Sequence, residues 1–401
     1  MVVPLDSPQP VFPIPPLSEI PDTAEDHPED GPFIVRQPTQ ESLGDLQPSL
    51  VFGAAAFSNQ YNTTEYLTSD VPLRTVRAAL RYGITAFDTS AYYGPSEIVL
   101  GTALKTLEPE FPRSSYRLMT KCGRYGLNKE DFDYSPATIR ASVNRSLFRL
   151  NTSYLDAVYL HDIEFVSEQV QPRDKGNHLL ALGSESEAYG LGKGDEAKIH
   201  GPGDQIILDA VAELREMKKE GLIKHIGITG YPLHTLLRIA ILVLHTAPFE
   251  PLDILLSYSH LHIQNDTFLD FVPQLRDRAR ISQFMAASPL NMGLLTPSPP
   301  SWHPAPDNLK DLVRKAGALC TEQGWEGGLP NVALGYAYRK SSEAGLPMVV
   351  GLSQLNEVHE TVKVWREILA QSAEEAVKRE ALETKVKSLF GDLVGFSWAS
   401  G

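Results

Sequence analysis

The stretch Phe87-Asp88-Thr89-Ser90-Ala91-Tyr92-Tyr93-Gly94-Pro95-Ser96-Glu97 decides the fold. It continues the apolar run Ile84-Thr85-Ala86-Phe87, which predicts the end of a buried strand, and the pair Ser96-Glu97 predicts the start of a helix. Asp88 and Tyr93 therefore come where a strand leaves the core. Parallel barrels carry their chemistry at this end of the strands, so the two residues are candidates for an acid/base device.

Two further polar residues follow strand-like runs. Lys121 comes directly after residues 116–120, and His161 directly after residues 155–160. In a parallel barrel, strand ends share one rim, so these side chains are expected near Asp88 and Tyr93. Each residue alone has an ordinary explanation, such as a solvated lysine, a histidine bonded to backbone or an Asp-Thr helix cap. Their joint order favours a site.

The rest of the chain alternates between strand-like and helix-like segments. This alternation predicts one α/β domain, a parallel (β/α)8 TIM barrel over residues 48–390, with a tail at residues 391–401. The hydrophobic content of 42% in 401 residues is enough for one large core. The expected strands are 50–53, 84–87, 116–120, 155–160, 224–228, 252–256, 281–286 and 348–350.

Two segments interrupt this pattern. Residues 1–47 are rich in proline and acidic residues, which predicts a disordered or extended tail. Residues 166–203 are polar and glycine-rich without periodicity, and they follow the strand that precedes His161. Their composition favours an unstructured, flexible insertion. A lid over the active-site rim is the alternative, because the insertion leaves the barrel at that rim.

The composition excludes several classes of function. A formal net charge of −14 argues against a nucleic-acid surface, which would need a basic face. Two cysteines, Cys122 and Cys320, are too few for a disulfide framework or a thiolate metal site, so no metal is expected. No apolar run approaches the ~20 residues that span a bilayer. We therefore expect a cytoplasmic protein with a small-molecule partner; the sequence does not indicate the oligomeric state.

These motifs resemble the aldo-keto reductases, which share a (β/α)8 barrel and an Asp/Tyr/Lys/His tetrad. The likeness is particularly to the fungal D-arabinose dehydrogenases and the plant L-galactose dehydrogenases of that family. It extends from about Leu50 to about Leu369. The segments that carry it are 87–97, 120–121, 160–165, 226–230, 286–290, 293–296, 350–351 and Glu357.

The resemblance implies a role for each member of the tetrad. Tyr93 would be the general acid/base, and Lys121 would stabilise its phenolate, since a free phenol has a pKa of about 10. Asp88 would hold the lysine ammonium, and His161 would hydrogen-bond the reacting oxygen. The alternative is that Tyr93 only packs while Asp88 and Lys121 form a structural ion pair. Adjacent residues point in different directions, and the resemblance selects Tyr93 rather than Tyr92.

The resemblance also implies a nicotinamide dinucleotide across the rim. No Gly-x-Gly-x-x-Gly motif follows the first strand, so a Rossmann site is not indicated. Residues 352–357 contain no cation for a 2′-phosphate, so we expect NAD rather than NADP. The implied cofactor-binding residues are Gly53, Ala54, Asp88, Thr229, Ser288, Leu290, Gly293, Leu294, Gly351, Ser353 and Glu357.

The chain departs from the wider family at two cofactor positions. Ala287 stands where many members have a tyrosine that stacks on the nicotinamide, and Thr229-Gly230 stands where many have Ser-Asn. The sugar dehydrogenases resemble this chain at both positions. The implied reaction is oxidation of an aldose, such as D-arabinose, at C1 to the 1,4-lactone with NAD. An NADPH-dependent aldehyde reductase and a non-catalytic dinucleotide-binding regulatory subunit are the alternatives.

Overall fold

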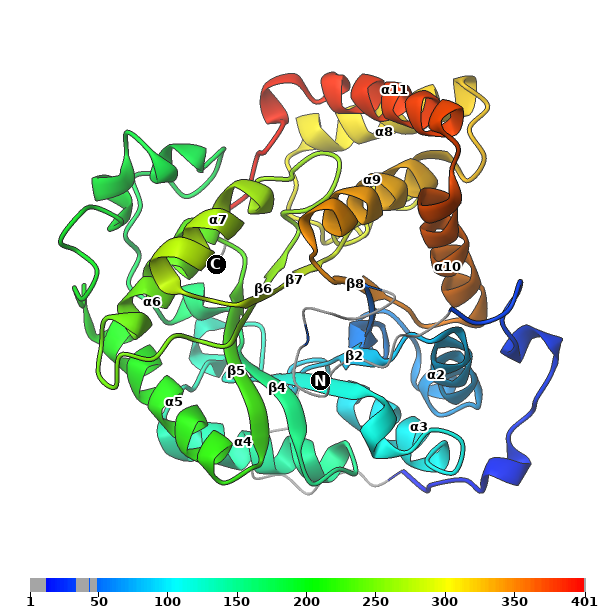
Figure 1. Cartoon of the computed structure of the whole chain (residues 1–401), viewed down its shortest axis with the longest axis horizontal. Helices are drawn as coiled ribbons and strands as arrows, with labels where there is room; N and C mark the ends of the chain where they lie inside the picture. Colours follow the sequence, from blue (N-terminus) through cyan, green and yellow to red (C-terminus); the bar gives the residue numbers. More distant parts are fainter. Residues whose placement is uncertain (1–11, 34–42, 44–48, 400–401) are drawn as a thin grey trace.

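The computed structural model describes residues 12–33, 43 and 49–399 (Figure 1). Its centre is a closed barrel of parallel strands, in which each strand pairs with the next and the last pairs with the first. This architecture confirms the predicted (β/α)8 barrel. The strands are β1 (Leu50–Gly53), β2 (Ala86–Asp88), β3 (Arg117–Cys122), β4 (Leu155–Leu160), β5 (Ile223–Gly230), β6 (Ile254–Tyr258), β7 (Gln283–Ala287) and β8 (Met348–Gly351).

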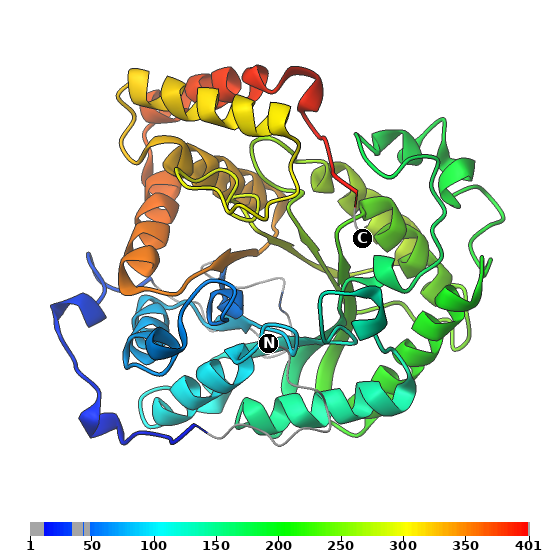
Figure 2. The same ribbon diagram turned by 180° about the vertical axis from the view of Figure 1, so that it is seen from behind.

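Helices surround the barrel, and α8 and α11 pack together outside α9 (Figures 1 and 2). None of the helices in the described part of the chain is long and apolar enough to cross a membrane. The helices are α1 (Thr64–Leu67), α2 (Val71–Tyr82), α3 (Ser96–Thr106), α4 (Pro136–Arg149), α5 (Pro202–Lys219), α6 (Leu233–Leu244), α7 (Phe268–Ala279), α8 (Asp307–Glu322), α9 (Gly328–Ala344), α10 (Leu355–Ala370) and α11 (Ala373–Leu389).

The strand residues alternate between two cores. Val51 and Met119 belong to a cluster inside the barrel, whereas their neighbours Phe52 and Leu118 pack outward against the helices. This is the period of two expected of strands with both faces buried. Along each strand, the residues that face the inside of the barrel are mostly aliphatic. At the C-terminal ends of the strands, polar and small residues take their place. The positions there are Gly53, Asp88, Lys121, Thr229, Tyr258, Ala287 and Gly351.

The strand ends differ slightly from those predicted. Asp88 is the last residue of β2, and Lys121 lies within β3 instead of following it. The apolar runs stop earlier because these inward positions carry charged side chains, while the backbone pairing continues. The predicted rim is unaffected.

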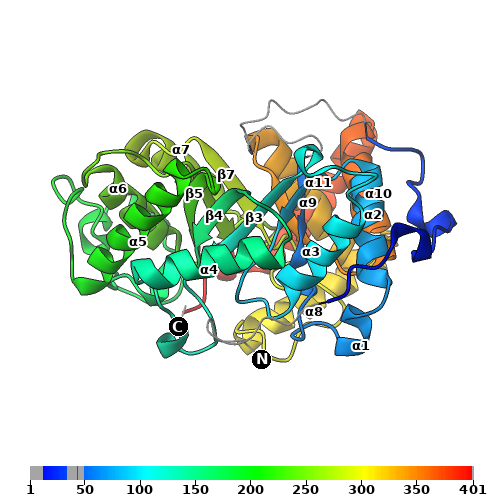
Figure 3. The ribbon, with the colours of Figure 1, turned by 90° about the horizontal axis from the view of Figure 1, so that it is seen from below.

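The described part of the N-terminal tail contains two short 3-10 helices, η1 (Leu17–Glu19) and η2 (Ala24–Asp26), and it packs against the barrel. Residues 12–33 run along the outside of the barrel beside α2 and α10 (Figures 1 and 3). Asp26 is fully buried, and its Oδ1 accepts hydrogen bonds from Arg74 and Arg77 of α2, both at 3.0 Å. The carboxylate of Asp26 thus binds two guanidinium groups and holds the segment against α2. The composition of the segment does not predict this packing. Residues 1–11, 34–42 and 44–48 lie outside the described residues.

The insertion at 166–203 is also packed, and the expected unstructured loop is not what the structure describes. The rings of His178 and Tyr189 contact the ring of His234 in α6, at 4.6 and 4.7 Å between ring centres. A few buried aromatic side chains therefore anchor a segment that is polar overall. Its short 3-10 helices are η7 (Leu179–Leu182) and η8 (Ser186–Tyr189).

The C-terminal segment crosses the barrel and meets this insertion. Trp398 stacks on Tyr231 with 4.7 Å between ring centres and 15° between ring planes. Ser397 pairs with Gly176 of the insertion through backbone hydrogen bonds. Residues 391–399 are therefore part of the packed structure.

Candidate active site

Asp88, Tyr93, Lys121 and His161 come together at the rim where the strands end. The Lys121 ammonium donates hydrogen bonds to Asp88 Oδ2 at 2.5 Å and to Thr89 O at 2.9 Å. It also lies 4.8 Å from the centre of the Tyr93 ring, which meets the His161 ring edge to face at 5.6 Å. Asp88, Lys121 and His161 are buried, whereas Tyr93 is partly exposed. An acid/base group at the edge of a buried ion pair is thereby accessible to a ligand.

The two adjacent tyrosines have different neighbours. The Tyr92 ring lies 4.0 Å from the guanidinium carbon of Arg124, while the Tyr93 ring lies beside Lys121. Both rings contact His161. The structure therefore gives Tyr93, and not Tyr92, the lysine neighbour that the motif implies.

The charges in this site are set mainly by burial. Burial raises the pKa of Tyr93 to about 12, and the attraction of Lys121 offsets only part of this rise. Burial lowers the pKa of Lys121, but Asp88 and Tyr93 together raise it more, so the net shift is upward. At neutral pH the pair is therefore an ammonium and a neutral phenol. The expected effect of the cation on the phenol is present but smaller than the cost of desolvating a phenolate.

His161 is neutral in this environment. Burial lowers the pKa of His161 well below its usual value, and the cations Lys121 and Arg124 lower it further. An imidazole that stays neutral can donate a hydrogen bond from only one of its two nitrogens. Which nitrogen carries the proton therefore matters for the chemistry.

Three contacts fix the orientation of His161. Its Nδ1 lies 2.9 Å from Ser90 Oγ, and its Nε2 lies 3.7 Å from Asp162 Oδ2. The hydroxyl of Tyr134 donates a hydrogen bond to the His161 carbonyl oxygen at 2.6 Å. Nδ1 of the ring is therefore hydrogen-bonded to Ser90, and Nε2 points away from Ser90.

Two glycines stand at the strand ends next to Asp88. Gly53 pairs with Asp88 on one side and Gly351 on the other. A side chain at Gly53 would come within 2.9 Å of Val350 O, whereas Gly351 is exposed with nothing nearby. Ala54 follows directly, and its carbonyl accepts a hydrogen bond from Ser96 at 2.6 Å. Of these three positions, only Gly351 leaves its backbone open to a ligand.

The segment after β7 forms a tight turn at the same rim. Ser288 and Gly293 both have positive φ, at 63° and 86°, and the Gly293 N–H donates to Leu290 O at 3.1 Å. Leu294 is fully buried beneath the turn. On the facing side, Thr229 Oγ1 is buried and has no hydrogen-bond partner among the described residues. A buried hydroxyl of this kind fits a polar ligand such as an amide.

Ser353 and Glu357 lie at the start of α10. Glu357 Oε2 accepts hydrogen bonds from Ser353 N at 2.6 Å, Ser353 Oγ at 3.1 Å and Gln354 N at 3.1 Å. The carboxylate therefore caps the helix that follows Gly351. It also places a negative charge beside the backbone N–H groups of Ser353 and Gln354.

Sequence reasoning gave no role to Arg124 or Asp162. Arg124 forms an ion pair with Asp162, and its guanidinium carbon lies 5.3 Å from the centre of the Phe132 ring and 5.4 Å from that of Phe165. An arginine placed shortly after Lys121, in a region rich in aromatic residues, is the signal that could have drawn attention to this pair.

Two other positions refine the sequence interpretation. His303 is buried, and its Nε2 lies 2.9 Å from Asn291 O. The C-terminal Trp398 covers it with an edge-to-face contact at 5.1 Å. Beside Ala287, the residue in register on the neighbouring strand is Tyr258. The aromatic ring nearest in register thus belongs to β6 instead of β7.

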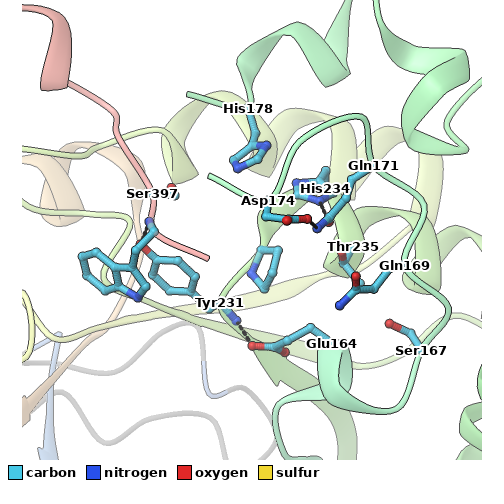
Figure 4. Close-up of a pocket in the computed structure, with 12 residues that line it drawn as sticks. Glu164, Ser167, Gln169, Gln171, Asp174, His178, Tyr231, His234, Thr235 and Ser397 are labelled. Carbon is cyan, nitrogen blue, oxygen red and sulfur yellow. Dashed lines mark hydrogen bonds between the residues drawn. The ribbon is translucent and has the colours of Figure 1, made fainter. Parts of the chain in front are cut away.

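A small polar cavity lies between the insertion, α6 and the C-terminal segment (Figure 4). Its volume is about 20 Å³, which is room for a water molecule but not for a sugar. Figure 4 shows Glu164 beside Tyr231, whose N–H donates to Glu164 Oε1 at 2.9 Å. This cavity is therefore too small for a sugar substrate, and the candidate active site remains the rim where Lys121, Asp88 and Tyr93 meet.

The structure is thus a parallel (β/α)8 barrel with an acid/base group beside a buried ion pair at its rim. Residues 49–379 match the Aldo/keto reductase family, and the chain belongs to this family. Members of the family bind nicotinamide dinucleotide cofactors.

Two relatives are similar over most of their length. The chain is 35% identical to L-galactose dehydrogenase of Arabidopsis thaliana, over 87% of this chain and 92% of the relative. It is 33% identical to D-arabinose 1-dehydrogenase of Saccharomyces cerevisiae, over 90% and 95%. A solved aldo-keto reductase from Bacillus halodurans in its holo form superposes with a TM-score of 0.55 at 20% identity, covering 84% of this chain and 91% of that one. The latter similarity concerns the fold alone.

Proposed function

We propose that this chain is an NAD-dependent aldose 1-dehydrogenase that oxidises D-arabinose or a similar sugar at C1 to the 1,4-lactone. The observation that carries the proposal is the buried Lys121–Asp88 pair beside Tyr93 and His161. The choice of sugar follows the relatives, which are named for the oxidation of L-galactose and D-arabinose.

Each member of the tetrad has one task in this reaction. The phenolate form of Tyr93, which Lys121 stabilises, takes the proton of the C1 hydroxyl and becomes a neutral phenol. Asp88 holds the ammonium in place, and His161 binds the same substrate oxygen. The nicotinamide, when bound, supplies the acceptor for the hydride that leaves C1. The sugar hemiacetal thus loses one hydride and one proton and becomes a lactone, with no covalent intermediate on the protein.

We further propose that NAD is preferred over NADP. Residues 352–357 contain no lysine or arginine, and Glu357 places a carboxylate beside Ser353. A charge-assisted contact is worth roughly 1.5–3 kcal/mol, so its absence corresponds to about a ten- to hundredfold preference. Steady-state kcat/KM values for the two cofactors measure this directly. Similar values for both would contradict the proposal.

Aldehyde reduction is the second candidate. It is favoured by the state of Tyr93, whose pKa of about 12 leaves the phenol protonated at neutral pH. A protonated phenol is the acid that a carbonyl oxygen needs when it is reduced. The two candidates use the same residues in opposite directions.

The test of the catalytic assignment is a pair of matched substitutions. Tyr93→Phe removes the hydroxyl beside Lys121, and we expect it to abolish turnover while NAD binding, followed by fluorescence titration, stays within about twofold of the original. Tyr92→Phe removes the hydroxyl of the neighbouring ring and should retain most activity. Full activity in Tyr93→Phe, or equal losses in both variants, would overturn the assignment.

A further inference from the structure

Ser90 contacts His161, and the proposed reaction has not used it. Ser90 is fully buried two residues beyond the end of β2, and its Oγ lies 2.9 Å from His161 Nδ1. The position of the shared hydrogen decides which nitrogen of the imidazole is left for a substrate.

The hydrogen bonds around Ser90 decide where that hydrogen lies. The backbone N–H of Tyr92 donates to Ser90 Oγ at 3.1 Å, so the serine oxygen already serves as an acceptor. If His161 Nδ1 also donated to it, the buried hydroxyl hydrogen would need a different acceptor. If the hydroxyl instead donates to Nδ1, the hydroxyl hydrogen has an acceptor and Nδ1 has a donor, as buried polar groups require. The single proton of the neutral imidazole then lies on Nε2.

The surroundings of the other nitrogen favour the same arrangement. Asp162 Oδ2 lies 3.7 Å from His161 Nε2, too far for a hydrogen bond but close enough to attract a proton electrostatically. Arg124 pairs with the same carboxylate. Both ends of the imidazole therefore point to one tautomer.

We propose that Ser90 is a positioning residue that holds His161 as the Nε2–H tautomer, so that the imidazole donates a hydrogen bond to the oxygen on the reacting carbon. The inference rests on the proposed function for the identity of that oxygen. An N–H donor stabilises the negative charge that this oxygen carries as the proton moves to or from Tyr93. An Nε2 without hydrogen would present a lone pair to the same oxygen and repel it.

The first test needs no substrate. In protein labelled with ¹⁵N at histidine, the His161 signals are assigned by their loss in His161→Gln. At pH 7 we expect a protonated Nε2 and an unprotonated Nδ1 in the original protein. In Ser90→Ala we expect the proton to shift at least partly to Nδ1, and in Ser90→Thr, which keeps the hydroxyl, the original pattern should return. An Nδ1–H signal in the original protein would overturn the proposal even if Ser90→Ala fails to fold.

The second test is kinetic. Ser90→Ala should lower kcat roughly ten- to hundredfold with no change in the dissociation constant of NADH, because the loss concerns a charge that develops during the reaction. Ser146→Ala, which removes another buried serine hydroxyl in α4, is the matched control and should keep kcat. Unchanged kcat and an unchanged tautomer in Ser90→Ala would refute the role. If the original protein oxidises no aldose, the proposed function fails, while the nitrogen spectra still decide the tautomer.

Discussion

Replacing Lys121 by methionine removes the ammonium that is paired with Asp88 inside the barrel rim. The two charges are 2.5 Å apart, and both side chains are almost completely buried. Removing one partner of such a pair leaves an uncompensated charge and costs about 3–5 kcal/mol. We expect Lys121→Met to lose this much of its free energy of unfolding at pH 7.

The double variant Asp88→Asn/Lys121→Met separates stability from catalysis. It also removes the carboxylate, so most of the lost free energy of unfolding should return. Activity should remain absent in both variants, because neither has a cation to stabilise the Tyr93 phenolate. The assays are urea denaturation followed by fluorescence and steady-state oxidation of the sugar.

Two outcomes would refute this reasoning. A Lys121→Met protein as stable as the original would mean that the ion pair is already compensated by water. Recovery of activity together with stability in the double variant would mean that Lys121 has no role in proton transfer.

Further predictions concern pH. Because burial raises the pKa of Tyr93 to about 12, kcat/KM for oxidation should rise about tenfold per pH unit between pH 7 and 9, since each unit increases the phenolate fraction tenfold; a flat profile would contradict this. Burial lowers the pKa of His260 and of His262 to about 3, so the unfolded chain binds more protons than the folded protein once the pH falls below about 6.5. These two residues should together reduce the free energy of unfolding by about 4 kcal/mol between pH 7 and pH 5. Urea midpoints at the two pH values measure the loss, and equal midpoints would show that these histidines are accessible to protons in the folded state.

The strands were predictable because each is a short apolar run that alternates along the chain with helix-like segments. β1 and β4 have the predicted bounds, and the four tetrad residues meet at one rim. Strand order explains this success, since consecutive parallel strands place their C-terminal ends together.

Packing of polar segments was not predictable in the same way. The insertion is held by His178 and Tyr189, and the N-terminal segment by the buried Asp26. The overall composition of such a segment is polar, and it does not reveal the few side chains that bury themselves and hold the segment in place. The partners of His161 were missed for a different reason: Ser90 is 71 residues away in the chain, and only the fold brings the two together.

The central claim is tested most directly by the product formed from D-arabinose. The purified protein is incubated with D-arabinose labelled with ¹³C at C1 and with NAD, and carbon NMR is recorded while NADH absorbance is followed. The account predicts that the first product is the 1,4-lactone, formed in equal amount to NADH, and that Tyr93→Phe forms neither. The absence of lactone from D-arabinose and L-galactose, together with rapid NADPH-dependent reduction of simple aldehydes, would contradict it.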